Sequence, residues 1–246
     1  METSHLNGMI YNTLAHYYDA LVKDDQATSA WHDWIHTVKI GFSILELACG
    51  SGEITRHLAQ DGVHIDALDL SEEMIAEAKQ KQDSQSIHYF TGNMLDLKEC
   101  GQYEAILCLC DSINYILDPD DLIHLFREVD AHLSDSGYFL FDTHSLDRLE
   151  EFQEEFNETG EFEDGVQYQW SIMAEDDFIY QDFAFYKLDG TIQQEHHIQR
   201  VYEPTWLYEQ LERFFTIVDI RTDFDQEGIQ SGEKYFYIVQ KKGKEQ

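Results

Sequence analysis

The feature that most constrains this chain is a short apolar run leading straight into a glycine-rich turn. Residues 43–48 (SILELA) have the length and composition of a buried strand. Residues 49–52 (CGSG) follow, before a helical pattern over 53–60. Glycine adopts backbone angles that a Cβ atom forbids, and it lets a ligand lie against the main chain. Because the amino end of a helix also offers free N–H groups, this turn predicts a binding site.

Strands and amphipathic helices alternate along the chain as far as residue 143. Further strands are expected over residues 63–68, 87–90, 103–110 and 137–143. Two helices are expected within 9–40, one after Ser71 and one from Pro119. Such alternation implies parallel βαβ units with right-handed crossovers. We therefore expect an α/β fold with a Rossmann-like, doubly wound, mostly parallel seven-stranded sheet.

The pattern changes after residue 145. An acidic helix over 146–156 is followed by three runs of strand character, over residues 166–174, 178–188 and 191–202. Asp189-Gly190 between the last two runs is a strong hairpin signal. We expect a small antiparallel β insertion between the fifth and sixth strands of the main sheet.

Helical periodicity returns after Pro204, and two final strands over 215–223 and 234–241 form a closing hairpin. The chain thus divides into a main domain of residues 1–145 and 204–246 and an inserted β-rich subdomain of residues 146–203. The insertion follows the fifth strand at the carboxyl end of the sheet, where ligands bind in open α/β folds. It can therefore cover the site as a lid.

The charge balance limits the partners of this protein. Its 246 residues include 49 acidic and 16 basic side chains, a formal net charge of -33. Nucleic-acid binding works by neutralising phosphates with Lys and Arg, so an acidic surface disfavours DNA, RNA and anionic membranes. No apolar run approaches the roughly 20 residues needed to span a bilayer. We expect neither a nucleic-acid nor a membrane partner.

The cysteines indicate a reducing compartment. Cys49, Cys100, Cys108 and Cys110 form no Cys-x-x-Cys pair, and no Cys/His spacing is typical of zinc. The first ten residues lack the pattern of a signal peptide. We therefore expect a cytoplasmic protein without a bound metal.

An acidic residue stands at the distance from the glycine turn where a ribose would lie. Asp69 follows Gly50 by nineteen residues and ends the expected second strand. A carboxylate about 20 residues past a glycine loop is placed to bind ribose hydroxyls. The alternatives are an ordinary tight turn and a cap for the following helix, for which Ser71 is also available.

Four segments resemble the motifs of class I S-adenosylmethionine (SAM)-dependent methyltransferases. Residues 46–52 (ELACGSG) resemble the first motif, with Ala48 in place of a glycine, and residues 67–74 (ALDLSEEM) are similar to the second. Residues 92–96 (GNMLD) are similar to a third motif, with Asn93 where the family has an acid that contacts the adenine amino group. Residues 110–115 (CDSINY) resemble the segment beside the transferable methyl. The chain ends also resemble small bacterial methyltransferases that carry a β-rich insertion.

The resemblance implies an enzyme with SAM as its cofactor. Glu46 would orient the glycine loop or the methionine ammonium group, and Asp69 would bind the ribose. Met94 would flank the adenine or belong to the core, and an aromatic cover over the sulfonium is electrostatically sensible. The residues expected to bind the cofactor are Tyr11, Tyr18, Trp31, Glu46, Ala48, Cys49, Gly50, Gly52, Asp69, Leu70, Met74, Asn93, Met94, Cys110 and Asp111.

Four residues are candidates for the acceptor side of the site, namely Asn114, Tyr115, His197 and Arg200. His197 also has a structural interpretation, and Arg200 would either hold an acceptor carboxylate or pair with a nearby acidic residue. The insertion has more aromatic residues than one packed face needs, so part of it would contact a small-molecule acceptor or a second subunit of a homodimer. No catalytic residue is assigned, since methyl transfer rests mainly on positioning and water exclusion.

Other functions share parts of this pattern. A SAM-binding protein that regulates or scaffolds without turnover would keep the same loop and Asp69. An NAD-dependent oxidoreductase would need a third glycine where Thr55 stands. A methyltransferase acting on nucleic acid or protein is a further alternative, and the net charge argues more strongly against nucleic acid.

Overall fold

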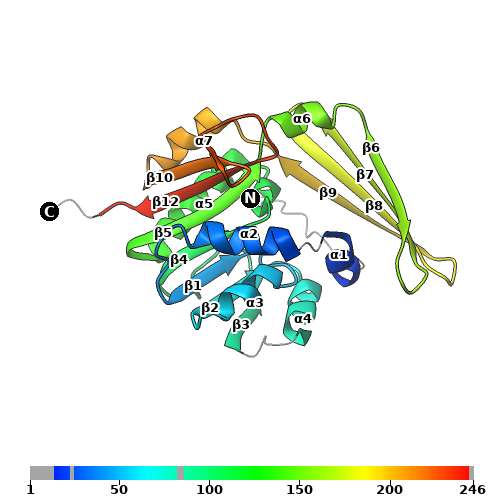
Figure 1. The fold of residues 1–246 in the computed structure, drawn as a ribbon, viewed down its shortest axis with the longest axis horizontal. Helices are drawn as coiled ribbons and strands as arrows, with labels where there is room; N and C mark the ends of the chain where they lie inside the picture. Colours follow the sequence, from blue (N-terminus) through cyan, green and yellow to red (C-terminus); the bar gives the residue numbers. More distant parts are fainter. Residues whose placement is uncertain (1–13, 23–24, 82–85, 244–246) are drawn as a thin grey trace, which may run out of the picture.

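The larger of two sheets confirms the expected α/β architecture. The computed structural model describes residues 14–22, 25–81 and 86–243. The larger sheet has eight strands in the order β11-β10-β12-β5-β4-β1-β2-β3 (Figure 1). Its strands are β1 (Ser43–Leu47), β2 (His64–Asp69), β3 (Ile87–Thr91), β4 (Tyr103–Cys108), β5 (Leu133–His144), β10 (Phe215–Thr222), β11 (Gln226–Glu227) and β12 (Lys234–Lys241).

Strand direction in this sheet follows the sequence pattern. The first five strands pair in parallel, and β12 lies antiparallel between β5 and β10. The doubly wound sheet is therefore mostly parallel, and its last hairpin supplies the antiparallel strands. The two-residue β11 is an addition to the seven expected strands, because so short a segment has no periodicity to detect.

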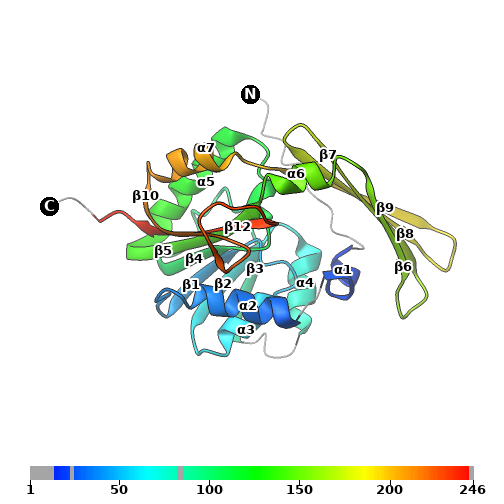
Figure 2. The same cartoon turned by 45° about the horizontal axis from the view of Figure 1, so that its top comes forward.

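Helices cover both faces of this sheet (Figure 2). The helices are α1 (Leu14–Val22), α2 (Asp25–Ile35), α3 (Glu53–Ala59), α4 (Glu72–Gln80), α5 (Pro119–His132), α6 (Asp147–Glu151) and α7 (Pro204–Leu211), with a 3₁₀ turn η2 (Ser112–Tyr115). Trp34, Leu58 and Ile75 pack α2, α3 and α4 on one face. Phe126 and Leu207 pack α5 and α7 on the other. No helix in the described part of the chain has the length and apolar character required to cross a membrane.

Local signals fix where these helices start. Ser71 Oγ accepts a hydrogen bond from the backbone N–H of Met74 at 3.1 Å, which caps α4. The Asp118 carboxylate accepts one from the N–H of Asp120 at 2.8 Å, and Pro119 occupies the first position of α5. Both starts lie where the sequence places them.

The second sheet has four antiparallel strands, one more than expected. Its order is β6 (Phe156–Glu161), β7 (Gln167–Glu175), β8 (Phe178–Tyr186) and β9 (Ile192–Arg200). The expected helix over 146–156 ends at Glu151 instead, and the chain then enters β6. Sequence periodicity missed β6 because it is an edge strand that buries no residue.

The aromatic residues of the insertion lie mostly on its inner face. Phe183, Phe185 and Tyr168 pack against Leu14 of α1, which stands between the two sheets (Figure 1). Part of the aromatic surplus therefore serves packing against α1, and Trp170 and Phe183 also line the large cavity between the sheets. The outer face carries one apolar cross-strand row of Met173, Tyr180 and Ile198, and a homodimer through the insertion stays a prediction.

Asn114 joins the two sheets. Its Nδ2 donates to Thr143 Oγ1 at 2.8 Å and to the carbonyl of Arg200 at 2.6 Å. Its Oδ1 accepts from the backbone N–H of His144 at 3.0 Å. The side chain is fully buried. One amide thus holds η2, β5 and β9 together.

The Asn114→Ala variant should lose stability because it leaves buried backbone groups of His144 and Arg200 without partners. We expect its free energy of unfolding to be about 2–4 kcal/mol lower than that of the wild type. Denaturant unfolding measures this difference. The matched control is Asn157→Ala on exposed β6, which should change stability by less than about 0.5 kcal/mol. Equal effects of the two substitutions would contradict the connecting role of Asn114.

Candidate active site

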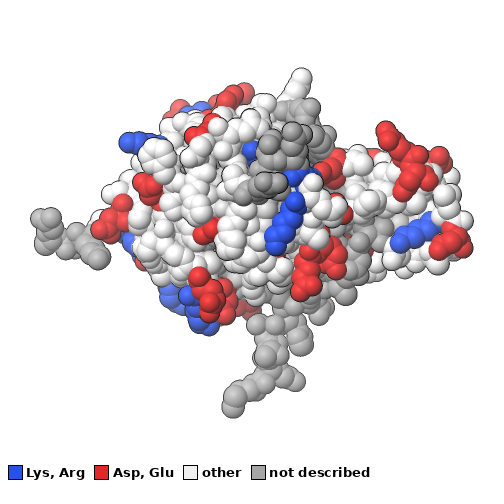
Figure 3. Space-filling model, turned by 90° about the horizontal axis from the view of Figure 1, so that it is seen from below, with Lys and Arg blue, Asp and Glu red and all other residues white. Residues whose placement is uncertain are grey.

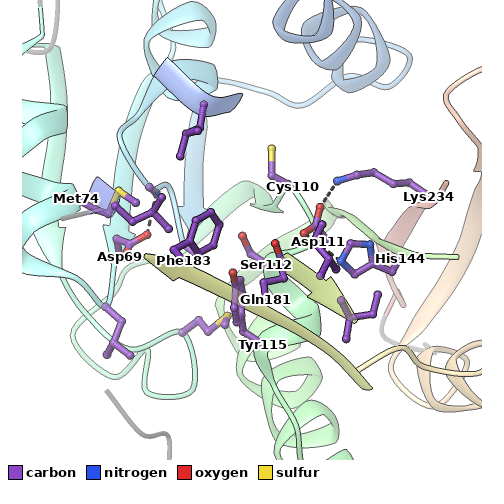
Figure 4. A pocket seen from close by; sticks show the side chains of 18 of the residues that line it. Asp69, Met74, Cys110, Asp111, Ser112, Tyr115, His144, Gln181, Phe183 and Lys234 are labelled. Carbon is purple, nitrogen blue, oxygen red and sulfur yellow. Dashed lines mark hydrogen bonds and ion pairs between the residues drawn. The ribbon is translucent and has the colours of Figure 1, made fainter. Parts of the chain in front are cut away.

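A cavity lies at the carboxyl ends of the parallel strands, where open α/β sheets bind ligands. Its volume is about 450 Å³. Loops after β1, β2, β3 and β4 form its floor, and α1, α2 and the inner face of β7 and β8 close it (Figure 4). Eleven of the residues expected at the site line it, namely Trp31, Ala48, Gly50, Asp69, Leu70, Met74, Asn93, Met94, Cys110, Asp111 and Tyr115. The strand order thus brings together residues that are far apart in sequence.

The two glycines of the turn have different roles. Gly50 has φ +55°, and a Cβ atom built there meets no described atom within 4 Å, so its backbone faces open space in the cavity. Gly52 has φ +75°, and a Cβ atom there would lie 2.4 Å from Tyr89 Oη. Gly52 is therefore a packing requirement and lies outside the lining formed by the described residues. Thr55, where an NAD fingerprint needs glycine, is fully buried.

Asp69 connects the glycine turn to the start of α4. Its Oδ2 accepts a hydrogen bond from the N–H of Gly50 at 2.8 Å, and its Oδ1 accepts one from the N–H of Ser71 at 2.9 Å. Burial raises the pKa of this carboxyl, while the backbone N–H groups lower it. Each carboxylate oxygen can accept a second hydrogen bond. Asp69 therefore serves the turn and retains acceptors at the cavity wall.

Glu46 carries a buried carboxyl group that a cation would stabilise. Its Oε2 finds no hydrogen-bond partner among the described residues, and burial raises its pKa to about 7. It lines a smaller cavity of about 130 Å³ together with Trp31, Cys49 and Gly50. The methionine ammonium group of SAM is a cation of the right kind for this position, so the residues present fit that cofactor.

The two residues expected around adenine, Asn93 and Met94, lie next to each other in the lining of the cavity. Asn93 Oδ1 accepts from the N–H of Leu95 at 2.9 Å, and Asn93 lines the cavity. Met94 lines the cavity and also packs on the core under β3 and α5. The packing interpretation of Met94 is thus confirmed, and its contact with adenine stays a prediction.

Of the three aromatic residues expected over the methionine end, the structure places one. Trp31 lines both cavities and packs against Trp34, Phe224 and Phe236. Tyr11 lies outside the described residues, and so does the side chain of Tyr18. Their contact with SAM stays a prediction.

A cluster of charged groups occupies the other end of the cavity. Lys234 Nζ forms an ion pair with Asp111 (Figure 4) and a second one, at 3.1 Å, with Asp142. Burial raises the pKa of Asp111, but the Lys234 ammonium outweighs it and holds that pKa below its usual range. Asp142 is fully buried, and its pKa is raised by that burial and by the neighbouring charge of Asp111, against the effect of Lys234.

His144 stands beside this cluster. Its Nε2 lies 3.0 Å from Gln199 Oε1 and 3.4 Å from Asp111 Oδ2. Burial lowers the pKa of His144, so the ring is neutral at neutral pH. Its Nδ1 has no hydrogen-bond partner in the part of the chain that the structure describes. A neutral imidazole with an unpaired nitrogen at a cavity wall can accept a proton.

Three acceptor-side candidates lie outside the cavity lining. Asn114 is occupied by the bonds that join the sheets. His197 is buried behind the lining on β9, where Tyr115 Oη lies 3.4 Å from its Nδ1. Arg200 pairs with Asp177 at 2.8 Å and donates to the carbonyl of Leu117, so the salt-bridge interpretation is the one that the structure favours. Of the four candidates, Tyr115 alone is in the lining formed by described residues.

Sequence reasoning missed Lys234, His144 and the lid residues of the cavity. Lys234 pairs across β12 and β5 with His144, and no local pattern shows that a lysine at the start of the last strand returns to the site. His144 ends β5, and its place at the carboxyl end of a parallel strand is the signal that would have found it. The missed lid residues are Phe152, Ile172, Ile179 and Gln181, whereas Trp170 and Phe183, which also line the cavity, belong to the aromatic residues of the insertion that were expected in part to contact an acceptor.

Glu46 should make stability depend on pH. The folded pKa of about 7 lies above the ordinary value of 4.5, so the folded state retains a proton that the unfolded state loses. Stability is then lost as pH rises between those values, by roughly 2–3 kcal/mol. Glu46→Gln should remove this loss. The free energy of unfolding of the variant, measured with denaturant, should therefore rise relative to that of the wild type between pH 5 and pH 8.5. An advantage independent of pH, or an equal trend in the exposed Glu150→Gln control, would disprove this role.

Similar proteins agree with the geometry of this site. Residues 44–137 match the model of a methyltransferase domain. The Bacillus subtilis protein named "Putative methyltransferase YqeM" is 33% identical over 95% of this chain and 98% of its own. The crystal structure of a SAM-dependent methyltransferase from Clostridium acetobutylicum is 30% identical, with a TM-score of 0.81 over 95% of this chain and 99% of that one.

A more distant relative has a named substrate. The dTDP-3-amino-3,6-dideoxy-alpha-D-glucopyranose N,N-dimethyltransferase of Streptomyces fradiae is 30% identical over 39% of this chain and 36% of its own. The full-length relatives, however, decide the family. This chain belongs to the class I SAM-dependent methyltransferases, and it is an enzyme that uses SAM as its cofactor.

Proposed function

We propose that this enzyme transfers the methyl group of SAM to a small organic acceptor held under the inserted sheet. The observation that carries the proposal is one continuous cavity. It runs from the glycine turn and Asp69 to the apolar inner face of β7 and β8. Its volume of about 450 Å³ is in the range of pockets for small ligands. Membership of the family disfavours the oxidoreductase and the non-enzymatic SAM-binding protein.

At the cofactor end, each polar residue has a counterpart on SAM. Asp69 would accept hydrogen bonds from the ribose hydroxyls, and Glu46 would face the methionine ammonium group. Asn93 would contact the adenine, and Trp31 would lie over the methionine end, where an aromatic face favours a cation. When bound, SAM supplies an activated methyl group on its sulfonium, so the protein has to orient and shield it.

At the acceptor end, the walls are apolar and one corner is polar. Phe152, Ile172, Ile179 and Phe183 offer an apolar surface, while Asp111, Tyr115 and His144 offer polar atoms. Such walls exclude water from the reaction. A base is required only for an acceptor that arrives protonated, and neutral His144 is the residue at this end suited to take that proton. Residues 146–203 act as the lid in this proposal.

Charge and relatives support a small molecule over a nucleic acid. The net charge is -33, and on the face shown in Figure 3 the Lys and Arg side chains lie apart from one another instead of forming a basic patch. The Streptomyces fradiae relative acts on a nucleotide-linked amino sugar.

The four free cysteines support a reducing, cytoplasmic location.

Calorimetry with SAM and S-adenosylhomocysteine tests the cofactor assignment directly. Incubation with methyl-labelled SAM and a library of small amines, alcohols and acids then tests the acceptor class. Labelled product together with S-adenosylhomocysteine would support the proposal. Binding of SAM with transfer only to protein or RNA substrates would overturn the small-molecule part.

Two glycines that both have positive φ allow a matched test of the cofactor end. Gly50→Ala should weaken SAM binding at least about 10-fold, because the new methyl group projects into the cavity that the backbone of Gly50 faces. Gly190→Ala is the control, since Gly190 also has positive φ and open surroundings among described atoms, but lies in the β8–β9 turn. Similar SAM affinities in the two variants, measured by calorimetry, would remove Gly50 from the site.

Two neighbouring residues of β7 allow a matched test of the lid. Ile172 lines the cavity, while Met173 is exposed on the opposite face. Ile172→Ala should raise the KM for the acceptor several-fold and leave the SAM affinity near the wild-type value. Met173→Ala should change neither. A change in SAM affinity alone would place β7 at the cofactor end.

A further inference from the structure

Two neighbouring helices far from the lid bring two histidines and a carboxylate together. Helices α2 and α3 lie side by side in both ribbon views (Figures 1 and 2). His32 lies in the last turn of α2 (Asp25–Ile35), and His36 follows its last residue. The N–H of His36 donates to the carbonyl of His32 at 3.1 Å, so the helical spacing of four residues carries both side chains to one face. Asp61 follows the end of α3, and its backbone N–H donates to the carbonyl of Leu58 at 3.0 Å. The three side chains therefore meet across the interface between α2 and α3.

The distances in this cluster are close to those of a metal site. Nε2 of His32 and Nε2 of His36 each lie 2.9 Å from Asp61 Oδ2. One donor atom from each residue falls within 4.8 Å of the others. Ligand atoms around a four-coordinate zinc ion, with bonds of about 2.0–2.1 Å, are about 3.3 Å apart. Each nitrogen–oxygen distance of 2.9 Å would have to lengthen by about 0.4 Å to reach that spacing, and the two imidazole nitrogens, which lie within 4.8 Å of each other, would have to adopt it too.

The surroundings suit an ion as well. The side chains of His32 and His36 are 23% and 36% exposed, so an ion can enter from solvent. His32 Nδ1 lies 3.8 Å from an Asp33 carboxylate oxygen, so a second carboxylate stands beside this imidazole. The ring of His57 makes edge contact with that of His32 at 4.9 Å between centroids, and water would complete the coordination of an ion held by three protein ligands. The pKa of Asp61 is raised by partial burial but lowered more by the two histidines, so this ligand is ionised.

We propose that His32, His36 and Asp61 bind one divalent transition-metal ion of the zinc class. Two imidazole nitrogens and one carboxylate oxygen favour Zn²⁺, Co²⁺ or Ni²⁺ over Mg²⁺ and Ca²⁺, which prefer oxygen ligands. The ion joins α2 to α3, and Trp31 beside His32 lines the large cavity. Because the ion would connect two helices, its role is structural. The proposal of this site does not depend on the acceptor proposed above.

The chain contains a matched control cluster of the same composition. His64 and His88 flank Asp66 on β2 and β3, with nitrogen–oxygen distances of 3.6 and 3.0 Å. Both of these histidines are 66% exposed. The carboxylate of Asp66 is also engaged by the hydroxyl of Tyr103 at 2.6 Å. This cluster tests whether acidity and exposed histidines alone are enough to hold an ion.

The experiment titrates untagged, chelator-treated full-length protein with ZnCl₂ in a buffer that contains millimolar MgCl₂. Calorimetry of the wild type should show one Zn²⁺ per chain, and titration with CoCl₂ should give a visible absorption band from nitrogen ligation. His36→Gln and Asp61→Asn should each weaken Zn²⁺ binding at least about 10-fold. The double variant His64→Gln/His88→Gln should bind like the wild type. Thermal unfolding should show a rise in Tm with Zn²⁺ for the wild type and the control, and a smaller rise for the site variants.

Opposite results would overturn the assignment. Unchanged Zn²⁺ affinity in His36→Gln and Asp61→Asn would show that the ion binds elsewhere. An equal loss in the His64→Gln/His88→Gln variant would show non-specific attraction to an acidic surface. Displacement of Zn²⁺ by millimolar Mg²⁺ would exclude nitrogen ligation. Circular dichroism of each variant without metal verifies that a loss of binding reflects a lost ligand and not a lost fold.

Discussion

The hydrogen bond between Asp69 and Gly50 is the interaction on which the site depends. It spans 2.8 Å and ties the turn after β1 to the end of β2. Parallel pairing in register, Leu47 opposite Leu68, brings the two strand ends level. The N–H of Cys49 donates to the carbonyl of Leu68 at 2.9 Å and extends the ladder by one step. The turn is thus held on both sides, which keeps the backbone of Gly50 against open space where a cofactor can approach it.

The same edge of the sheet concentrates negative charge. Glu46, Asp69 and Asp142 are buried there, and Asp111 lies next to them. Lys234 offsets Asp111 and Asp142, whereas backbone N–H groups alone stabilise Asp69 and Glu46 retains an unpaired oxygen. Burial of carboxylates without cations costs free energy. SAM carries a sulfonium and an ammonium group, so a cationic cofactor is what this arrangement favours, and its binding would relieve part of that cost.

The cofactor half was predictable from sequence because its residues lie close to their strands. Gly50, Asp69, Asn93 and Asp111 each follow the end of a parallel strand, and such ends meet at one edge in any doubly wound sheet. The acceptor half was harder to predict, since its walls come from pairings of remote strands. Lys234 reaches the site through the antiparallel pairing of β12 with β5. His197 kept both a structural and an acceptor-side interpretation at the level of sequence, because strand alternation decides which face a residue takes but not what covers that face. The cluster of His32, His36 and Asp61 was missed for a similar reason, because Asp61 lies in the turn after a different helix, α3.

Different parts of the structure therefore determine the shapes of the two ends of the cavity. The cofactor end rests on main-chain geometry and on carboxylates fixed by the turn, so few substitutions are tolerated there. The acceptor end rests on side chains of an inserted sheet that packs against α1 and α6 and is joined to the main sheet by Asn114. Exchanging Ile172 or Ile179 changes the shape of that wall without touching the glycine turn. Acceptor specificity can therefore change through the inserted sheet while the glycine turn and Asp69 keep the cofactor end unchanged.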